Sequence, residues 1–166
     1  MSRKRMDREQ LQRSLNEQLA RHHSASVLMY HQTVADNLGL NATDLKCLEL
    51  VLGEEDVTAG RMAEASGLTT AAITSVIDRL ERSGFVRRER DQEDRRKVII
   101  RPLSAHLSEL DALFLPLSKA MDGLYQKLSE EELVTIQNFI IQTDQVLQLE
   151  TIRLRELRNE RENPGF

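Results

Sequence analysis

Apolar side chains recur along most of this chain at the spacing of a helix. Between about Met6 and Leu38 there is neither proline nor glycine, and apolar residues return every three to four positions over most of the segment. A period near 3.6 residues indicates a helix, and the many Arg, Glu and Gln residues around it leave a narrow apolar stripe. Gly39 follows directly, and glycine favours the left-handed conformation that ends many helices. We therefore expect one long helix up to Gly39.

Three shorter helices are predicted next. Thr43 is the expected N-cap of the first, with Asp44 in its first turn, where the helix dipole favours negative charge. Gly53 should end it, and its inward face would hold Leu45, Leu48, Val51 and Leu52.

The second and third of these helices form a pair. Thr58 is the expected cap of a short helix that Gly67 ends, and Thr69 is the expected cap of a longer one that Gly84 ends. One face of the longer helix is apolar at i, i+3, i+4 and i+7, through Ile73, Val76, Ile77 and Leu80. Two helices separated by a short turn that contains glycine are typical of a helix-turn-helix.

After Gly84 the apolar period changes from that of a helix to that of a strand. Residues 85–90 and 97–101 are β-prone and flank a polar stretch, residues 91–96. This pattern predicts a β-hairpin with a long charged tip, whose second strand ends at Pro102.

Two long helices complete the predicted fold, at roughly 104–127 and 129–158. Pro116 should kink the first, because it removes a backbone donor and clashes with the preceding turn. Ser129 and Glu132 make a capping box for the second. Its apolar seam is close to heptad spacing, through Leu133, Ile136, Ile140, Thr143, Leu147 and Leu154.

The expected architecture is mainly α with a small β-hairpin. It is a winged helix-turn-helix, residues 41–103, flanked by long N- and C-terminal dimerisation helices at residues 1–40 and 104–166. Because the outer helices carry apolar stripes that one chain would leave exposed, we expect a homodimer.

Composition and charge exclude several classes of protein. The chain of 166 residues is 40% apolar and 30% charged, which is ordinary for a folded globular protein. No segment approaches the roughly 18 apolar residues of a membrane span, and the charged N-terminus leads into no apolar signal region. One cysteine excludes an internal disulfide framework. These features predict a cytoplasmic protein with no membrane partner.

The net charge of −4 hides a basic island. Residues 79–101 hold nine Lys and Arg against five Asp and Glu, which leaves 14 basic against 22 acidic residues elsewhere. DNA responds to the local field more than to the total charge, so this island fits a nucleic-acid contact. From charge alone, a solvated charged hairpin is the slightly favoured interpretation.

The predicted helix 69–83 presents small residues opposite its apolar face, namely Thr70, Ala71, Thr74, Ser75 and Asp78. Small side chains let a helix approach the floor of the major groove, where hydroxyls bond base edges and alanine packs against a thymine methyl. The first amides of the helix are also suited to phosphate. The same face equally fits an ordinary solvated surface.

The hairpin tip indicates DNA contact more specifically. Arg95, Arg96 and Lys97 are too polar for a core, and guanidinium groups are favoured in a narrow minor groove. Asp91 and Asp94 would repel DNA unless each pairs with a neighbouring arginine and fixes its direction, which is the arrangement we expect.

Residues 60–103 resemble the winged helix-turn-helix of the MarR (multiple antibiotic resistance regulator) family. The resemblance includes the wing sequence Asp94-Arg95-Arg96 and the Leu-Glu-x-x-Gly-x-Val junction from Leu80 to Val86. The order of the flanking helices also fits, so the resemblance covers nearly the whole chain. It implies a dimer with interleaved terminal helices and two wings on one pseudo-palindrome, with Arg96 in the minor groove, oriented by Asp94.

The chain departs from the family pattern at two places. Gln92 stands where proline is frequent, and the second strand ends in Arg-Pro-Leu at residues 101–103 rather than in the usual entry to the next helix. The resemblance therefore leaves the start of that helix open.

The resulting hypothesis is a sequence-specific transcriptional regulator of double-stranded DNA, a repressor acting as a homodimer on a pseudo-palindromic operator. The predicted DNA contacts are Thr69, Thr70, Ala71, Thr74, Ser75, Arg79, Arg88, Arg90, Asp94, Arg95, Arg96 and Lys97. The alternative is a helical interaction module or antirepressor that binds no DNA, although the basic wing argues against it. No nucleophile elbow, phosphate-binding glycine loop or metal motif points to an enzyme.

Three further groups of residues are candidates for a redox, metal-binding or effector-binding role. Cys47 lies midway along its predicted helix beside Leu45 and Leu48, which favours a buried structural cysteine over a redox sensor. The four histidines form no i, i+4 ligand pair, so neither a metal nor a cofactor is expected. The family resemblance places small phenolic or aromatic effectors near Tyr30 and His31, although packing or solvent contact is the more ordinary role of such residues.

Overall fold

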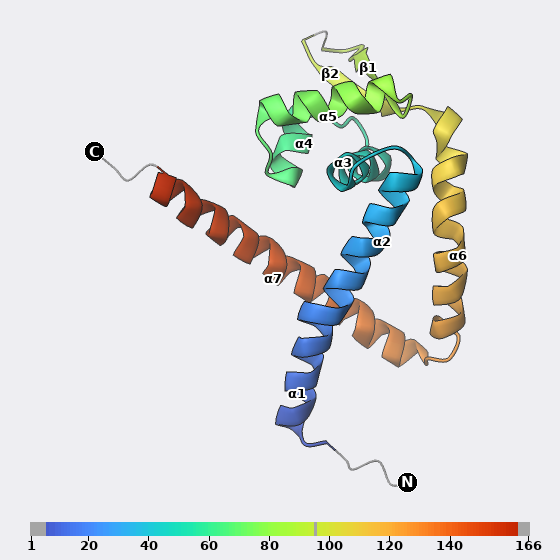
Figure 1. The fold of residues 1–166 in the computed structure, drawn as a ribbon, viewed down its shortest axis with the longest axis vertical. Coiled ribbons are helices and arrows are strands. Elements are labelled where there is room, and N and C mark those ends of the chain that lie inside the picture. Colours follow the sequence, from blue (N-terminus) through green and yellow to red (C-terminus); the bar gives the residue numbers. More distant parts are fainter. Residues whose placement is uncertain (1–5, 95, 163–166) are drawn as a thin grey trace. The chain divides into compact units, whose positions relative to one another are not determined.

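The computed structural model describes residues 6–94 and 96–162, which are mainly helical with one two-stranded antiparallel sheet (Figure 1). This confirms the predicted fold class. The chain forms two compact units that divide between Leu113 and Phe114.

The N-terminal segment is a continuous helical run, as its apolar period predicted. It comprises α1 (Arg8–Glu17), a π-helical segment (Gln18–His23) and α2 (Ser24–Asn37). Asp7 caps α1 by accepting the backbone N–H of Gln10 at 2.8 Å. The run ends at Gly39, whose φ of +65° is the left-handed conformation that glycine permits.

Helix α3 (Ala42–Gly53) corrects two predictions. Its N-cap is Asn41, not Thr43, because Asn41 has the extended backbone of a cap and its side chain accepts the Asp44 N–H at 2.8 Å. Leu52 is 38% exposed rather than part of the core. It lies in the last turn, and the helical period does not reveal which end of a helix another element covers.

The helix-turn-helix is built as predicted. Helix α4 (Ala59–Ser66) is capped by Thr58 and ends at Gly67, and helix α5 (Thr70–Arg82) is capped by Thr69, whose hydroxyl accepts the Ala72 N–H at 3.2 Å. Gly84 follows α5 with a φ of +76°. The predicted apolar face of α5 is entirely buried, namely Ile73, Val76, Ile77 and Leu80.

The wing is the hairpin of β1 (Val86–Arg90) and β2 (Val98–Pro102), paired from Val86 opposite Pro102 to Arg90 opposite Val98. Its root joins the core because the N–H of Ile100 donates to the carbonyl of Val57 at 2.7 Å. Val86, Ile99 and Ile100 are buried, while Val98 and most of the described residues of the tip are exposed. The wing therefore extends from the same core that holds α5.

The C-terminal part contains α6 (Leu107–Tyr125), entered through a 3₁₀ turn (Ser104–His106), and α7 (Glu130–Glu162). Helix α6 continues past Pro116. The predicted capping box at the start of α7 is present, since Ser129 and Glu132 exchange side chain to backbone hydrogen bonds of 2.8 and 3.2 Å. None of the described helices is long and apolar enough to cross a membrane.

Candidate nucleic-acid interface

The first turns of α5 present a small, polar surface to solvent. Thr69, Thr70, Ala71, Thr74 and Ser75 are all exposed. The buried apolar face turns this side of the helix outward, because residues three and four apart share a face. The structure thus brings together the five predicted contacts on this helix face.

Two of these side chains have their hydroxyl protons engaged within the helix. The Thr74 hydroxyl donates to the carbonyl of Thr70 at 2.9 Å, and the Ser75 hydroxyl donates to the carbonyl of Ala71 at 3.2 Å. The oxygen of each hydroxyl keeps its acceptor capacity toward solvent. In this arrangement the helix face offers acceptors, which suit the amino groups of adenine and cytosine.

The wing tip is organised by aspartates that bind backbone amides. One oxygen of Asp91 accepts the N–H groups of Glu93 and Asp94, each at 2.8 Å, and Asp94 accepts the N–H of Arg96 at 3.0 Å. These bonds within the described tip differ from our expectation that each aspartate pairs with an arginine side chain. Asp94 instead orients Arg96 through the backbone.

The Asp91 carboxylate is stabilised in its ionised form. Backbone N–H groups of Asp94 and Glu93 donate to it and lower the pKa of Asp91 below its ordinary value. A lowered folded-state pKa contributes stability above the unfolded pKa and loses it as the pH falls through the folded value. The tip therefore keeps this support at neutral pH and loses it only in acid.

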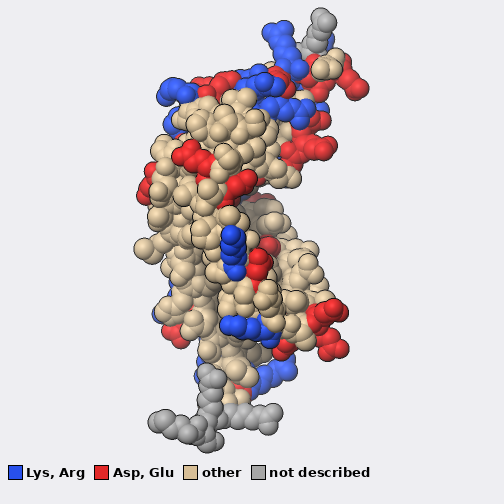
Figure 2. All heavy atoms as spheres, turned by 90° about the vertical axis from the view of Figure 1, so that its right-hand side faces the viewer, with Lys and Arg blue, Asp and Glu red and all other residues tan. Residues whose placement is uncertain are grey.

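The basic side chains of the tip are available to a partner. Arg90, Arg96 and Lys97 are exposed, and no carboxylate among the described residues lies within ion-pair distance of their charged ends. Figure 2 shows blue basic side chains gathered toward the wing end, with acidic ones between them. Arg95, another predicted contact, lies outside the described residues.

Arg79 and Arg88, also predicted to contact DNA, form ion pairs with carboxylates of the protein itself. The Arg79 guanidinium donates to both oxygens of Asp44, from Nε at 2.9 Å and from Nη2 at 2.6 Å. These bonds raise the pKa of Arg79. Arg88 on β1 donates from Nη2 to Asp78 at 2.5 Å and from Nη1 to Glu81.

The buried partner, Asp44, is a functional candidate that sequence reasoning missed. We interpreted it only as a first-turn acid, whereas its side chain is 3% exposed. The available signal was its position beside Leu45 on the inward face of α3. A buried carboxylate requires a cation and hydrogen-bond donors.

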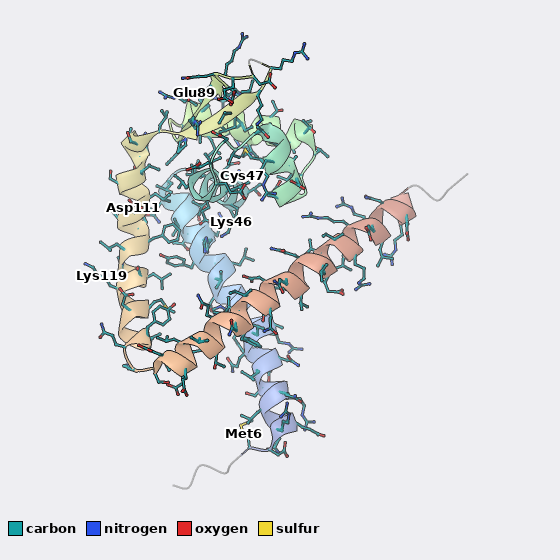
Figure 3. The ribbon with its side chains drawn as sticks, turned by 180° about the vertical axis from the view of Figure 1, so that it is seen from behind. Met6, Lys46, Cys47, Glu89, Asp111 and Lys119 are labelled. Atoms are coloured by element: carbon teal, nitrogen blue, oxygen red, sulfur yellow. The ribbon has the colours of Figure 1, made fainter. Side chains whose placement is uncertain are left out.

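Cys47 is buried in α3, as expected, and Figure 3 shows it on that helix next to Lys46. Burial raises the pKa of the thiol, the Asp44 carboxylate raises it further, and Arg79 partly offsets both. Cys47 also lines a largely apolar cavity of about 480 Å³ between α3 and α4. Among the described residues, no group of three or more His, Cys, Asp or Glu is placed to hold a metal.

We predict that Cys47 reacts slowly with iodoacetamide at pH 7. Each unit by which the pKa rises lowers the thiolate fraction about tenfold, and burial restricts access as well. The native protein should react at least about tenfold more slowly than the same protein in denaturant, measured by mass spectrometry over time. Equal rates in the two conditions would show that the thiol is accessible and activated.

Tyr30 and His31 join three helices. The Tyr30 hydroxyl donates to the carbonyl of Leu113 in α6 at 3.1 Å, and Nδ1 of His31 lies 3.2 Å from a carboxylate oxygen of Glu49 in α3. The two rings meet edge to face with centroids 5.8 Å apart. Both side chains are half-buried.

Comparison with known proteins identifies similar chains. The sequence model described as "MarR family" matches residues 40–98. An uncharacterized helix-turn-helix-type transcriptional regulator of Bacillus subtilis, YcgE, is 37% identical over 84% of this chain and 90% of its own length.

Solved structures with the same fold include a MarR family protein from Bacillus stearothermophilus, with a TM-score of 0.66 and 23% identity over 86% of this chain and 99% of that one. A mutant of S. aureus MepR bound to an oligodeoxyribonucleotide has a TM-score of 0.53 and 17% identity over the same shares. At these identities the likeness establishes the fold.

Proposed function

Because this chain belongs to the MarR family of helix-turn-helix transcriptional regulators, we propose that it is a homodimeric repressor of a pseudo-palindromic operator in double-stranded DNA. The observation that carries the proposal is the pairing of two exposed elements on one core. The small face of α5 suits the major groove, and the basic wing tip suits the adjacent minor groove.

The proposed DNA contacts fall into two groups. Thr69, Thr70, Ala71, Thr74 and Ser75 would face base edges and phosphates, and Arg90, Arg95, Arg96 and Lys97 would supply the cations of the wing, with Asp94 orienting Arg96. The fold shared with the DNA-bound MepR mutant supports this assignment. In the proposed organisation, residues 41–103 bind DNA and residues 1–40 and 104–166 dimerise.

The proposal of a dimer rests on apolar surface that a single chain leaves open. On α7 many large apolar side chains are exposed, including Ile136, Phe139, Ile140, Leu147, Leu149 and Leu154. Leu11, Leu15 and Leu19 of the N-terminal run are also exposed. Large apolar side chains left exposed on a segment mark an interface, and a second copy of the chain offers the same side chains in return.

Sedimentation tests the dimer separately from DNA binding. We expect a stable dimer at micromolar concentration, and we expect Leu147→Glu on α7 to shift it toward monomer while the far-ultraviolet circular dichroism is kept. A wild-type chain that sediments as a monomer at that concentration would contradict the proposal.

Selection of bound sequences from a random pool of duplex DNA tests the function. Two inverted half-sites about 10 base pairs apart, one helical turn, are expected from a two-fold dimer. Transcription in vitro from a promoter that carries the selected operator should fall as protein is added, because a bound dimer covers the site that polymerase requires. Enrichment of no sequence would contradict the function, and increased transcription would contradict repression alone.

We also propose that a small phenolic or aromatic effector acts beside Tyr30 and His31. These residues link α2 to α3 and to the start of α6, so a ligand that rearranges them would favour one arrangement of the recognition helices. Calorimetric titration with phenolic acids, repeated with the operator present, tests this. Compounds that fail to bind, or that bind without changing operator affinity, would remove the effector from the proposal.

A further inference from the structure

The charged residues of α5 are mostly engaged in contacts with other elements. The helix carries Asp78, Arg79, Glu81 and Arg82, and the first three bond to residues outside it. A helix that enters a DNA groove needs an orientation held to within a small tolerance, because base edges lie at fixed positions.

The first of these contacts joins α5 to α3. Asp44 receives two hydrogen bonds from Arg79 and a third from the side-chain amide of Asn41, at 2.9 Å. With its carboxylate almost wholly buried, Asp44 requires the Arg79 fork in one position, since an unpaired buried charge is strongly unfavourable. The bidentate geometry sets both the distance and the rotation between the two helices.

The second contact joins α5 to the wing. Arg88 of β1 donates its side chain to Asp78 and Glu81, and its backbone N–H donates to Glu81 at 3.0 Å. Asp78 lies on the exposed side of α5, where an uncompensated carboxylate would repel phosphate. Arg88 therefore fixes the start of the wing to the helix and also neutralises that carboxylate.

We infer that Arg79 and Arg88 are positioning residues for DNA recognition, which hold α5 against α3 and β1, and that neither neutralises a phosphate itself. This inference rests on the proposed function and departs from our sequence-based expectation that both contact DNA. It predicts that operator affinity depends on the ion pairs that these arginines form with Asp44, Asp78 and Glu81, and not on a direct contact of either arginine with phosphate.

A charge-free pair tests Arg79. In the double variant Asp44→Leu/Arg79→Met, apolar side chains replace the ion pair between the buried Asp44 carboxylate and the partly exposed Arg79, a type of exchange that many folds tolerate. We expect its operator affinity to fall at least about fivefold, because the fork that sets α5 against α3 is lost. Its salt dependence should stay that of wild type, because no phosphate contact is removed. Arg79→Met alone leaves Asp44 buried without its cation and should lose at least about tenfold in operator affinity, while non-specific DNA affinity is kept.

The double variant decides the question even if the single variant unfolds. If it folds by circular dichroism and its salt slope falls by about one unit per half-site, then Arg79 is a phosphate ligand and the inference fails. If it binds the operator as wild type does, the ion pair does not position α5 and the inference fails as well. Wild-type protein that binds no operator would instead contradict the proposed function, so the two failures are distinguishable.

Arg88 has its own test. Arg88→Ala exposes Asp78, so operator affinity should fall, and adding Asp78→Ala should recover at least about fivefold of the loss. If Arg88 were a phosphate ligand, Asp78→Ala would raise operator affinity by the same factor whether Arg88 is present or absent. Operator affinities of wild type, both single variants and the double variant, measured at one salt concentration, separate these outcomes.

Discussion

Replacing Leu48 with alanine should lower the free energy of unfolding by about 2–5 kcal/mol, the range for truncating a leucine in a packed core. Leu48 is 0% exposed and lies on the inward face of α3, a helix that packs against α2, α4, α5 and β2. The substitution loses the transfer free energy of the side chain and leaves a cavity. Urea unfolding followed by circular dichroism, at fixed protein concentration, measures the loss.

Leu52→Ala is the matched control, because it makes the same chemical change four residues later in the same helix. With 38% of the residue exposed, it should cost less than about 1 kcal/mol. Equal losses from the two variants would mean that the core of α3 extends to its C-terminal turn, as the apolar period alone had indicated.

Replacing Arg96 with alanine should weaken operator binding by about 1–3 kcal/mol and lower the salt slope by about one unit per half-site. In the proposed complex the guanidinium lies in the minor groove, where the negative potential is enhanced. Preference at the central operator positions should change little, because the minor groove distinguishes mainly A·T from G·C. Binding isotherms at several salt concentrations give both quantities.

Two further variants serve as a control and a comparison for Arg96→Ala. Arg153→Ala removes a cation from α7, where it pairs with Glu150, and should leave operator affinity unchanged. Thr74→Ala should relax preference at one or two base pairs with little change in salt slope, because it removes a groove-facing hydroxyl and no charge. If Arg96→Ala binds the operator as wild type does, the hairpin is not a DNA-contacting wing.

Local features of this chain follow from its sequence because their causes lie within one or two helical turns. Thr58 and Thr69 cap helices since their hydroxyls reach amides three residues on. Gly39, Gly67 and Gly84 end helices because they adopt positive φ angles. The buried face of α5 and the hairpin after it follow from apolar periodicity, and the small exposed face of α5 is the remainder of the same helix.

Contacts between distant residues required the tertiary structure. Asp44 and Arg79 are 35 positions apart in the sequence. No local sequence pattern distinguishes an arginine that bonds a buried carboxylate from one whose side chain is available to DNA. The exposure of Leu52 likewise depends on where neighbouring helices end. Sequence thus determined which segments fold and which faces are apolar, because those depend on neighbours along the chain. Which charges are engaged and which remain available was decided by packing, because it depends on neighbours in space.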